Sequence, residues 1–102
     1  MKDRYFRPMD HHEYRGLLAD LELTQVHASR MLHIADRSSR NYALGLRDIH
    51  GPMAGVLRLM RKYRLEPDDV ADVVKANGGD LFSALIELME KNDVSPRKLA
   101  AM

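Results

Sequence analysis

The 102-residue sequence contains no cysteine, which excludes disulfide bonds and cysteine-based metal sites and is typical of a protein of the reducing cytoplasm. It has no apolar run long enough to cross a bilayer and no signal-peptide pattern, so we expect neither a membrane span nor export. Aromatic residues make up only 6% of the chain, and no segment alternates apolar and polar residues as a half-buried strand does. These absences leave an all-α protein as the expected fold class.

Charge is nearly balanced over the whole chain but not along it. The formal net charge is +1 at pH 7. Residues 1–64 hold twelve Lys or Arg against seven Asp or Glu, a net +5, whereas residues 65–102 hold four against eight, a net −4. This asymmetry points to a polyanion as partner of the basic half and to a different role for the acidic half. The alternative is two solvated faces that differ in charge without any partner.

A capping box predicts where the first helix begins. Asp10 can accept a hydrogen bond at the helix start, and Glu13, three residues later, can reach back to it. Met9 and Tyr14 stand at the positions of a hydrophobic staple around this start. Leucines at helical spacing follow, so we predict a helix over about residues 10–22.

Three more predicted helices complete the basic half. Thr24 is a good cap for a second helix over about residues 25–32. A third helix covers about residues 36–44 and stops at Gly45, which can adopt the left-handed conformation that ends many helices. Pro52 suits the first turn of a fourth helix, in which apolar residues recur at helical spacing.

The acidic half contains a further pair of predicted helices and a short last turn. Pro67 begins one helix and Gly78 closes it. Asp80 caps the next helix, over about residues 81–91, and Pro96 can start the final turn.

These elements predict a compact helical bundle in three parts: a flexible arm over residues 1–8, a helical domain over residues 9–64 and an acidic helical extension over residues 65–102. The seam near residues 64–67 coincides with the change in charge sign. A domain this small buries only part of its surface and often gains stability by oligomerising. The extension can therefore either pack on the domain and complete one core, or expose an apolar face that forms a dimer.

The second and third predicted helices are short and joined by a tight turn, which is the helix-turn-helix arrangement. In this arrangement the first helix of the pair lies across the DNA backbone, and the second places its exposed side chains in the major groove. Arginine and asparagine are suited to that role because each can form two hydrogen bonds to a base edge. The polar residues of the third predicted helix are Asp36, Arg37, Ser38, Arg40 and Asn41.

A longer pattern surrounds this helix pair. It consists of Leu, Thr and Gln, a small residue, a turn, and a helix that ends in an aromatic residue and Gly. The positions are Leu23, Thr24, Gln25, Ser29, His33, Ala35, Asp36, Arg37, Tyr42 and Gly45. With the "GP" and "MAGVLRLM" that follow, residues 9–61 resemble the Cro/repressor-type (XRE-like) helix-turn-helix domains of phage and bacterial regulators.

This resemblance implies a homodimer that binds paired half-sites on double-stranded DNA and regulates transcription, with repression as the expected mode, in the cytoplasm and at the nucleoid. It implies that bases are contacted by Asp36, Arg37, Ser38 and Asn41. It implies phosphate contacts by Thr24, Gln25 and Arg40, and charge alone suggests Arg47 and Lys62 as further ones. The alternative for the arginines is that they are solvated residues of a helix surface.

Several positions depart from the family pattern. Ser29 replaces an alanine where the helices cross, and His33 replaces the turn glycine, which requires a left-handed histidine or a different turn. Ala35 cannot cap the third helix, although Asp36 can do so one residue later. Ser39 replaces a buried β-branched residue, which leaves a hole or an unpaired polar group at a cost of about 1–3 kcal/mol. A second hypothesis is therefore a degenerate helix-turn-helix that serves as a protein-interaction module, such as an antitoxin-like component.

No constellation of residues points to catalysis or to a metal. His11 and His12 stand beside Glu13, but neighbouring residues on a helix point about 100° apart and do not converge on one ion. No nucleophile is paired with a base at a matching spacing. We therefore expect no enzymatic activity, no cofactor and no metal site, and we assign any protein partner to the acidic residues 65–102.

Overall fold

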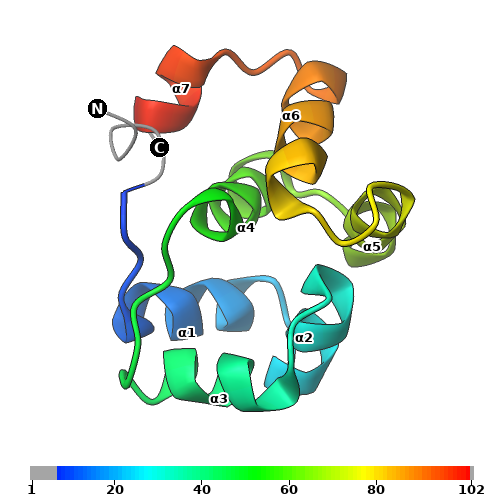
Figure 1. Ribbon diagram of the computed structural model, residues 1–102. Helices are drawn as coiled ribbons and strands as arrows, with labels where there is room; N and C mark the ends of the chain where they lie inside the picture. Colours follow the sequence, from blue (N-terminus) through cyan, green and yellow to red (C-terminus); the bar gives the residue numbers. More distant parts are fainter. Residues whose placement is uncertain (1–6, 102) are drawn as a thin grey trace.

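Seven α-helices and no β-strand make up the secondary structure of residues 7–101, the part of the chain that the computed structural model describes (Figure 1). The helices are α1 (His11–Asp20), α2 (Gln25–Leu32), α3 (Asp36–Ala43), α4 (Pro52–Tyr63), α5 (Pro67–Ala76), α6 (Leu81–Lys91) and α7 (Pro96–Ala101). The prediction of an all-α protein is confirmed. None of these helices is long and apolar enough to cross a membrane. Most of the expected N-terminal arm, residues 1–6, lies outside the described residues.

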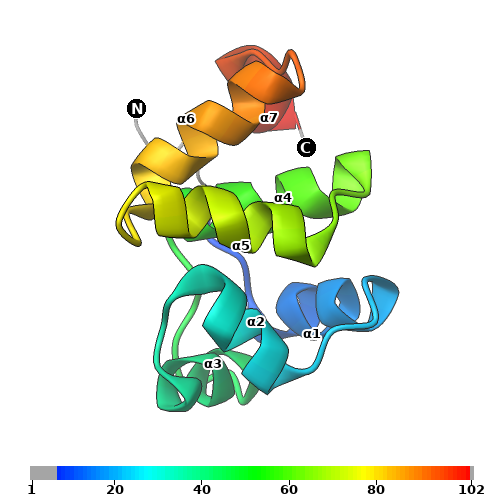
Figure 2. The same ribbon diagram turned by 90° about the vertical axis from the view of Figure 1, so that its right-hand side faces the viewer.

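The helices are arranged so that α3 lies at one end of the molecule. In Figure 1, α1, α2 and α3 lie together at that end, α4 and α5 form the middle, and α6 and α7 lie at the other end. Figure 2 shows α5 alongside α4, between α2 and α6. The contacts agree with this order, because α2 packs against both α3 and α5, and α4 packs against α6. The acidic extension thus completes the bundle on the side away from α3.

One hydrophobic core joins the two halves of the chain. Its buried side chains include Tyr14 of α1, Leu57 of α4, Leu85 of α6 and Leu99 of α7. Full burial of one such leucine contributes roughly 1.5–3 kcal/mol to stability. Side chains from both sides of residues 64–67 belong to this cluster, so the acidic extension packs on the basic half rather than standing apart from it.

Left-handed residues end most of the helices and reverse the chain sharply. These residues are Glu22, His33, Gly45, Arg64, Gly78 and Asp93. After each of them, the next residue donates its backbone N–H to the carbonyl five positions back, as Leu46 does to Asn41 at 3.0 Å. The reversals shorten two predicted helices, because α1 ends at Asp20 and α3 ends at Ala43. Four of the six residues are not glycine, and each such residue costs about 1–2 kcal/mol in this conformation.

The start of α1 is tied to the rest of the bundle by backbone and by charge. Met9 and Ile49 form an antiparallel bridge with N···O distances of 2.8 and 2.9 Å. Asp10 accepts a hydrogen bond from the Glu13 N–H at 2.9 Å, as expected of the helix cap. The second half of the predicted capping box is wrong, because the Glu13 carboxylate binds the Arg58 guanidinium at 2.8 and 3.0 Å. A charge-assisted bond to a buried cation is stronger than one to a backbone amide.

Candidate nucleic-acid interface

The helix pair α2–α3 has the compact geometry that the sequence predicted. Residues 33–35 join the two helices, which pack directly against each other. His33 ends α2 with φ 57° and ψ 42°, so the left-handed histidine, rather than a different turn, is what the chain adopts. Both views place α3 at the outer end of the molecule, where nothing else in residues 7–101 covers its far side (Figures 1 and 2).

Ser39 holds α3 on the bundle by hydrogen bonds. Its side chain is fully buried, and its hydroxyl donates to the backbone carbonyl of Gln25 in α2 at 3.2 Å. The Ser39 oxygen also lies 2.7 Å from the Tyr14 hydroxyl of α1, which is therefore the donor in that bond. Burial raises the pKa of Tyr14, so this donor stays protonated at neutral pH. The polar group that the sequence left without a partner thus links three helices.

A second buried hydroxyl fixes the first turn of α3. Ser29 of α2 is fully buried, and its Oγ bonds both the Val26 carbonyl, at 2.8 Å, and the carboxylate Oδ1 of Asp36. The expectation that Asp36 caps α3 is wrong: Asp36 is the first helical residue, and Ala35 occupies the cap position without a side-chain bond. The Asp36 carboxylate is therefore partly engaged inside the helix pair, although the residue as a whole is exposed.

The spacing of residues along α3 separates its inner face from its outer face. Ser39 and Ala43, four residues apart, are buried, so the positions half a turn away point outward. Asn41 and Arg37 lie on that outward side, whereas Arg40 lies at its edge. Arg37 and Arg40 are exposed, and Ser38 and Asn41 are half-buried. The outer face of α3 therefore presents two guanidinium groups to solvent, with a hydroxyl and an amide beside them.

Arg47 is held close to α3 by the aromatic residues of the core. Its guanidinium carbon lies 5.7 Å from the centre of the Tyr42 ring, within the range of a cation–π contact. Tyr42 in turn meets Tyr14 edge to face, with ring centres 6.2 Å apart. The turn between α3 and Arg47 requires glycine at position 45, because Gly45 has φ 78° and a Cβ there would meet the His11 ring of α1 at 2.9 Å. Arg47 thus adds a third exposed cation at the C-terminal end of α3.

The start of α2 supplies neutral hydrogen-bond donors in addition to the cations of α3 and its following loop. Thr24 is the cap of α2 and accepts a hydrogen bond from the His27 N–H at 3.0 Å. Thr24 and Gln25 are both exposed. The first backbone N–H groups of a helix have no partner within the helix and favour an anion such as a phosphate. The candidate phosphate contacts Thr24, Gln25, Arg40 and Arg47 therefore lie on the helix pair and the loop that follows it.

Lys62, the remaining candidate suggested by charge, lies elsewhere. It stands near the end of α4, where it lines a pocket together with Lys98 of α7. Since α7 and α3 lie at opposite ends of the molecule, the structure does not bring Lys62 together with the other candidate residues (Figure 1).

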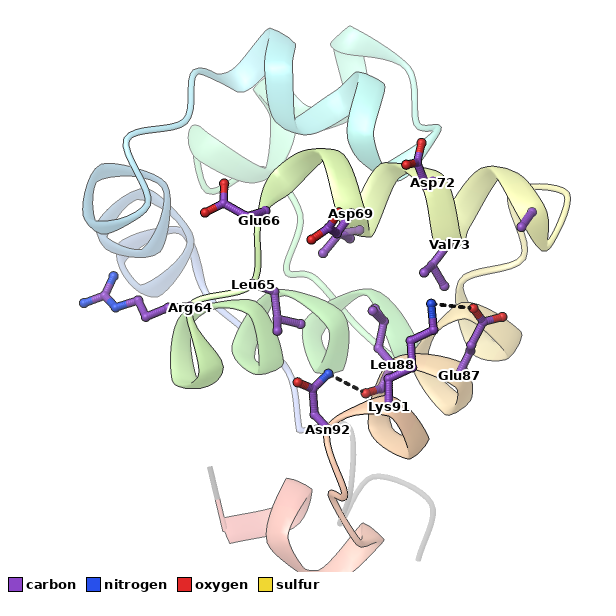
Figure 3. Close-up of a pocket in the computed structure, with 12 residues that line it drawn as sticks. Arg64, Leu65, Glu66, Asp69, Asp72, Val73, Glu87, Leu88, Lys91 and Asn92 are labelled. Atoms are coloured by element: carbon purple, nitrogen blue, oxygen red, sulfur yellow. Dashed lines mark hydrogen bonds and ion pairs between the residues drawn. The ribbon is translucent and has the colours of Figure 1, made fainter.

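The acidic half forms a groove between α5 and α6, with a volume of about 560 Å³ (Figure 3). Its carboxylates are Glu66, Asp69, Asp72 and Glu87, and Leu65 and Leu88 are among its apolar lining. Glu87 pairs with Lys91 at 3.3 Å, whereas Arg64 points away from the groove and pairs with Asp20, also at 3.3 Å. An acidic rim repels nucleic acid, which leaves the α3 end as the electrostatically favourable side for DNA.

Within residues 7–101, no group of three or more His, Cys, Asp or Glu side chains could hold a metal ion. The ring centres of His11 and His12 lie 4.0 Å apart, but no third ligand accompanies them in that part of the chain. Comparison of the chain with protein-family models, curated proteins and solved structures found no match.

Sequence reasoning missed how the candidate interface is held in place. The sequence pattern places Tyr14 in a hydrophobic staple and Ser39 among the departures from the family pattern, yet their hydroxyls bond each other. The sequence pattern places Glu13 at the helix cap and gives Arg58 no role, yet they form an ion pair in which Arg58 is buried and Glu13 is half-buried. One signal was available for Arg58: an arginine in the middle of the apolar run "MAGVLRLM" has to be buried with a partner.

Proposed function

We propose that this protein is a sequence-specific, DNA-binding transcriptional regulator of bacterial or phage type, with α3 as its recognition helix. The observation that supports this most is the division of α3 into two faces. Its inner face is fastened to α1 and α2 through buried Ser39, while Arg37 and Arg40 remain exposed and without an ion pair among the described residues. Two unpaired guanidinium groups on a fixed helix are well suited to base edges and phosphates.

In this proposal the candidate residues divide into those that contact bases and those that contact phosphates. Arg37 and Asn41 read base edges in the major groove, since both side chains can donate in pairs, and Ser38 and Asp36 flank them. The phosphate backbone is contacted by Arg40 and Arg47, and by Thr24 and Gln25 at the start of α2. These contacts fix the position of the protein along the duplex. The protein acts as a homodimer on two half-sites in the cytoplasm, at the nucleoid, and represses transcription by occupying them.

The test is selection from a pool of random double-stranded DNA, with sequencing of the bound fraction at two salt concentrations. We expect enrichment of an inverted repeat whose half-site centres lie about 34 Å apart, one turn of the duplex. Salt-sensitive binding without an enriched motif would reduce the proposal to a non-specific DNA binder. The absence of binding at low salt would overturn it. The control variant is Arg97→Ala on α7, at the end of the molecule away from α3, which should enrich the same repeat as the unchanged protein.

One observation favours the second candidate, a helix-turn-helix that docks on another protein. Leu44 and Leu46, directly after α3, are 61% and 69% exposed. They flank Gly45 in an ordered turn, so their exposure does not come from a loose loop. If the DNA selection fails, these two leucines beside the polar face of α3 are the place to look for a protein contact, together with the acidic groove of residues 65–102.

A further inference from the structure

The cations of the basic half form two groups, and the candidate DNA interface uses only one of them. Arg37, Arg40 and Arg47 belong to α3 and the loop after it. A second group comes from the C-terminal half of α4, and it is joined there by a lysine from α7. Its members are Arg58, Arg61, Lys62 and Lys98.

These four cations line one pocket. The pocket has a volume of about 470 Å³, and Tyr63 and Ala101 complete its lining. It is formed by two helices far apart in the sequence, so the tertiary fold brings Lys98 to the residues of α4. Its size lies within the range of sites for small molecules, about 300–1,000 Å³, and exceeds what a single inorganic ion needs.

Among residues 7–101, Arg58 is the one member of the four that pairs with a carboxylate. Arg58 is 4% exposed, and its guanidinium binds the Glu13 carboxylate as well as the backbone carbonyls of Arg7 and Pro8. Arg58 holds the pKa of Glu13 below its ordinary value, and the positive charges of Arg7 and Arg61 lower it further. Glu13 is therefore a carboxylate that is already fully engaged by Arg58.

Arg61, Lys62 and Lys98 form no salt bridge within residues 7–101. Basic residues in the last turn of α4 interact favourably with the helix dipole, which explains Arg61 and Lys62 in part. It does not explain why Lys98 of another helix joins them, because like charges that line one pocket repel each other. An anion in the pocket would relieve this repulsion.

We propose that the pocket between α4 and α7 binds a small phosphorylated ligand. The unpaired groups comprise one guanidinium, which can bind two phosphate oxygens side by side, and two ammonium groups, which act as compact charges. Three positive charges match an anion with two or more negative charges better than they match a single carboxylate. The proposal does not rest on the proposed function, since α7 lies at the opposite end of the molecule from α3 (Figures 1 and 2).

The experiment is a calorimetric titration of the full chain with tripolyphosphate at constant ionic strength. We expect saturable one-to-one binding by the unchanged protein. The double variant Arg61→Ala, Lys98→Ala should bind at least about tenfold more weakly, because it loses two charge-assisted contacts. The matched control is the double variant Lys75→Ala, Arg97→Ala, which removes the same charge from exposed positions outside the pocket and should bind as the unchanged protein does.

Three outcomes would overturn the proposal. Tripolyphosphate could fail to saturate, or both double variants could weaken its binding equally, which would mean that only the net charge matters. The third is loss of tripolyphosphate binding in Arg37→Ala, Arg40→Ala, which would place the anion at α3. A parallel titration with duplex DNA distinguishes a small phosphorylated ligand from the phosphates of the DNA backbone. Loss of DNA binding in Arg61→Ala, Lys98→Ala would make the pocket a contact for the DNA backbone and would also overturn the proposal. A failure of DNA binding alone leaves the tripolyphosphate result unaffected. Thermal unfolding of each variant confirms that it is folded.

Discussion

The hydroxyl oxygens of Tyr14 and Ser39 lie 2.7 Å apart in the core, although 25 residues separate them in the chain. The bond connects α1 to the inner face of α3, and Ser39 extends it to α2 through the Gln25 carbonyl. This contact, the Ser29–Asp36 bond and the burial of Ala43 together position α3 and its exposed side chains relative to the bundle. A recognition surface on a helix needs such a fixed base, because side chains must meet base edges with a precision of a fraction of an ångström.

We predict that Ser39→Ala lowers the free energy of unfolding by about 1–3 kcal/mol, since it leaves the buried Tyr14 hydroxyl without a partner. Urea denaturation measures this value. Ser38→Ala, at the half-buried neighbouring position, should change it by less than about 0.5 kcal/mol. In the double variant with Tyr14→Phe, the two losses should not add, because both remove the same bond. Additive losses would show that the two hydroxyls are not coupled.

The Glu13–Arg58 pair predicts a loss of stability in acid. Glu13 has a lowered pKa in the folded protein, chiefly because of its hydrogen bonds to Arg58. A carboxyl of this kind contributes stability above its unfolded pKa and loses that contribution as the pH falls through its folded pKa. We expect the urea midpoint to fall between about pH 5 and pH 3, and to fall less in Glu13→Gln.

Asp20 provides the control for this pH effect. It pairs with Arg64 at 3.3 Å, but the two side chains are 42% and 63% exposed, so solvent screens the pair. Asp20→Asn should therefore leave the acid slope of the urea midpoint close to that of the unchanged protein. An acid slope that Glu13→Gln does not alter would mean that other carboxyls, such as Asp10, account for it.

We predict that His33→Gly stabilises the protein by about 0.5–1 kcal/mol. Histidine in the left-handed conformation is strained, and glycine removes that strain while it adds freedom to the unfolded chain. Urea denaturation again measures the change. His27→Gly, inside α2 and exposed, is the control and should destabilise by about 1 kcal/mol. A loss of stability in His33→Gly would indicate that contacts of the His33 side chain outweigh the strain of its backbone.

If α3 reads DNA, its two arginines should have different effects. Arg37→Ala should reduce the discrimination between the selected site and random DNA, by about 1–3 kcal/mol for one lost bidentate base contact. Arg40→Ala should weaken binding to all DNA and lower the slope of log affinity against log salt by about one unit. Fluorescence anisotropy at several salt concentrations measures both. Equal losses on specific and random DNA in Arg37→Ala would remove Arg37 from the base-reading group.

The local signals of the sequence determined the helices and their order. The caps Asp10, Thr24 and Asp80 each accept the hydrogen bond that their residue type predicts. Helix α2 has the predicted bounds, and α4 and α5 begin at Pro52 and Pro67 as predicted. These features depend on residues within one turn of each other, so the order of residues along the chain is enough to specify them. The charge boundary near residue 64 is likewise a property of the sequence alone.

Only the tertiary structure decided the partners of the buried polar groups. The Glu13 carboxylate could accept a hydrogen bond from the backbone N–H at the start of α1 or from a distant cation. It binds Arg58, 45 residues away, because the fold buries that guanidinium beside it. Ser39 and Tyr14 became partners because α1 and α3 pack side by side. Lys98 likewise joins Arg61 and Lys62 only because the fold brings residues of α7 and α4 to one pocket. Contacts of this kind join residues that are distant in sequence, and packing of the apolar faces brings them together; no local pattern encodes them.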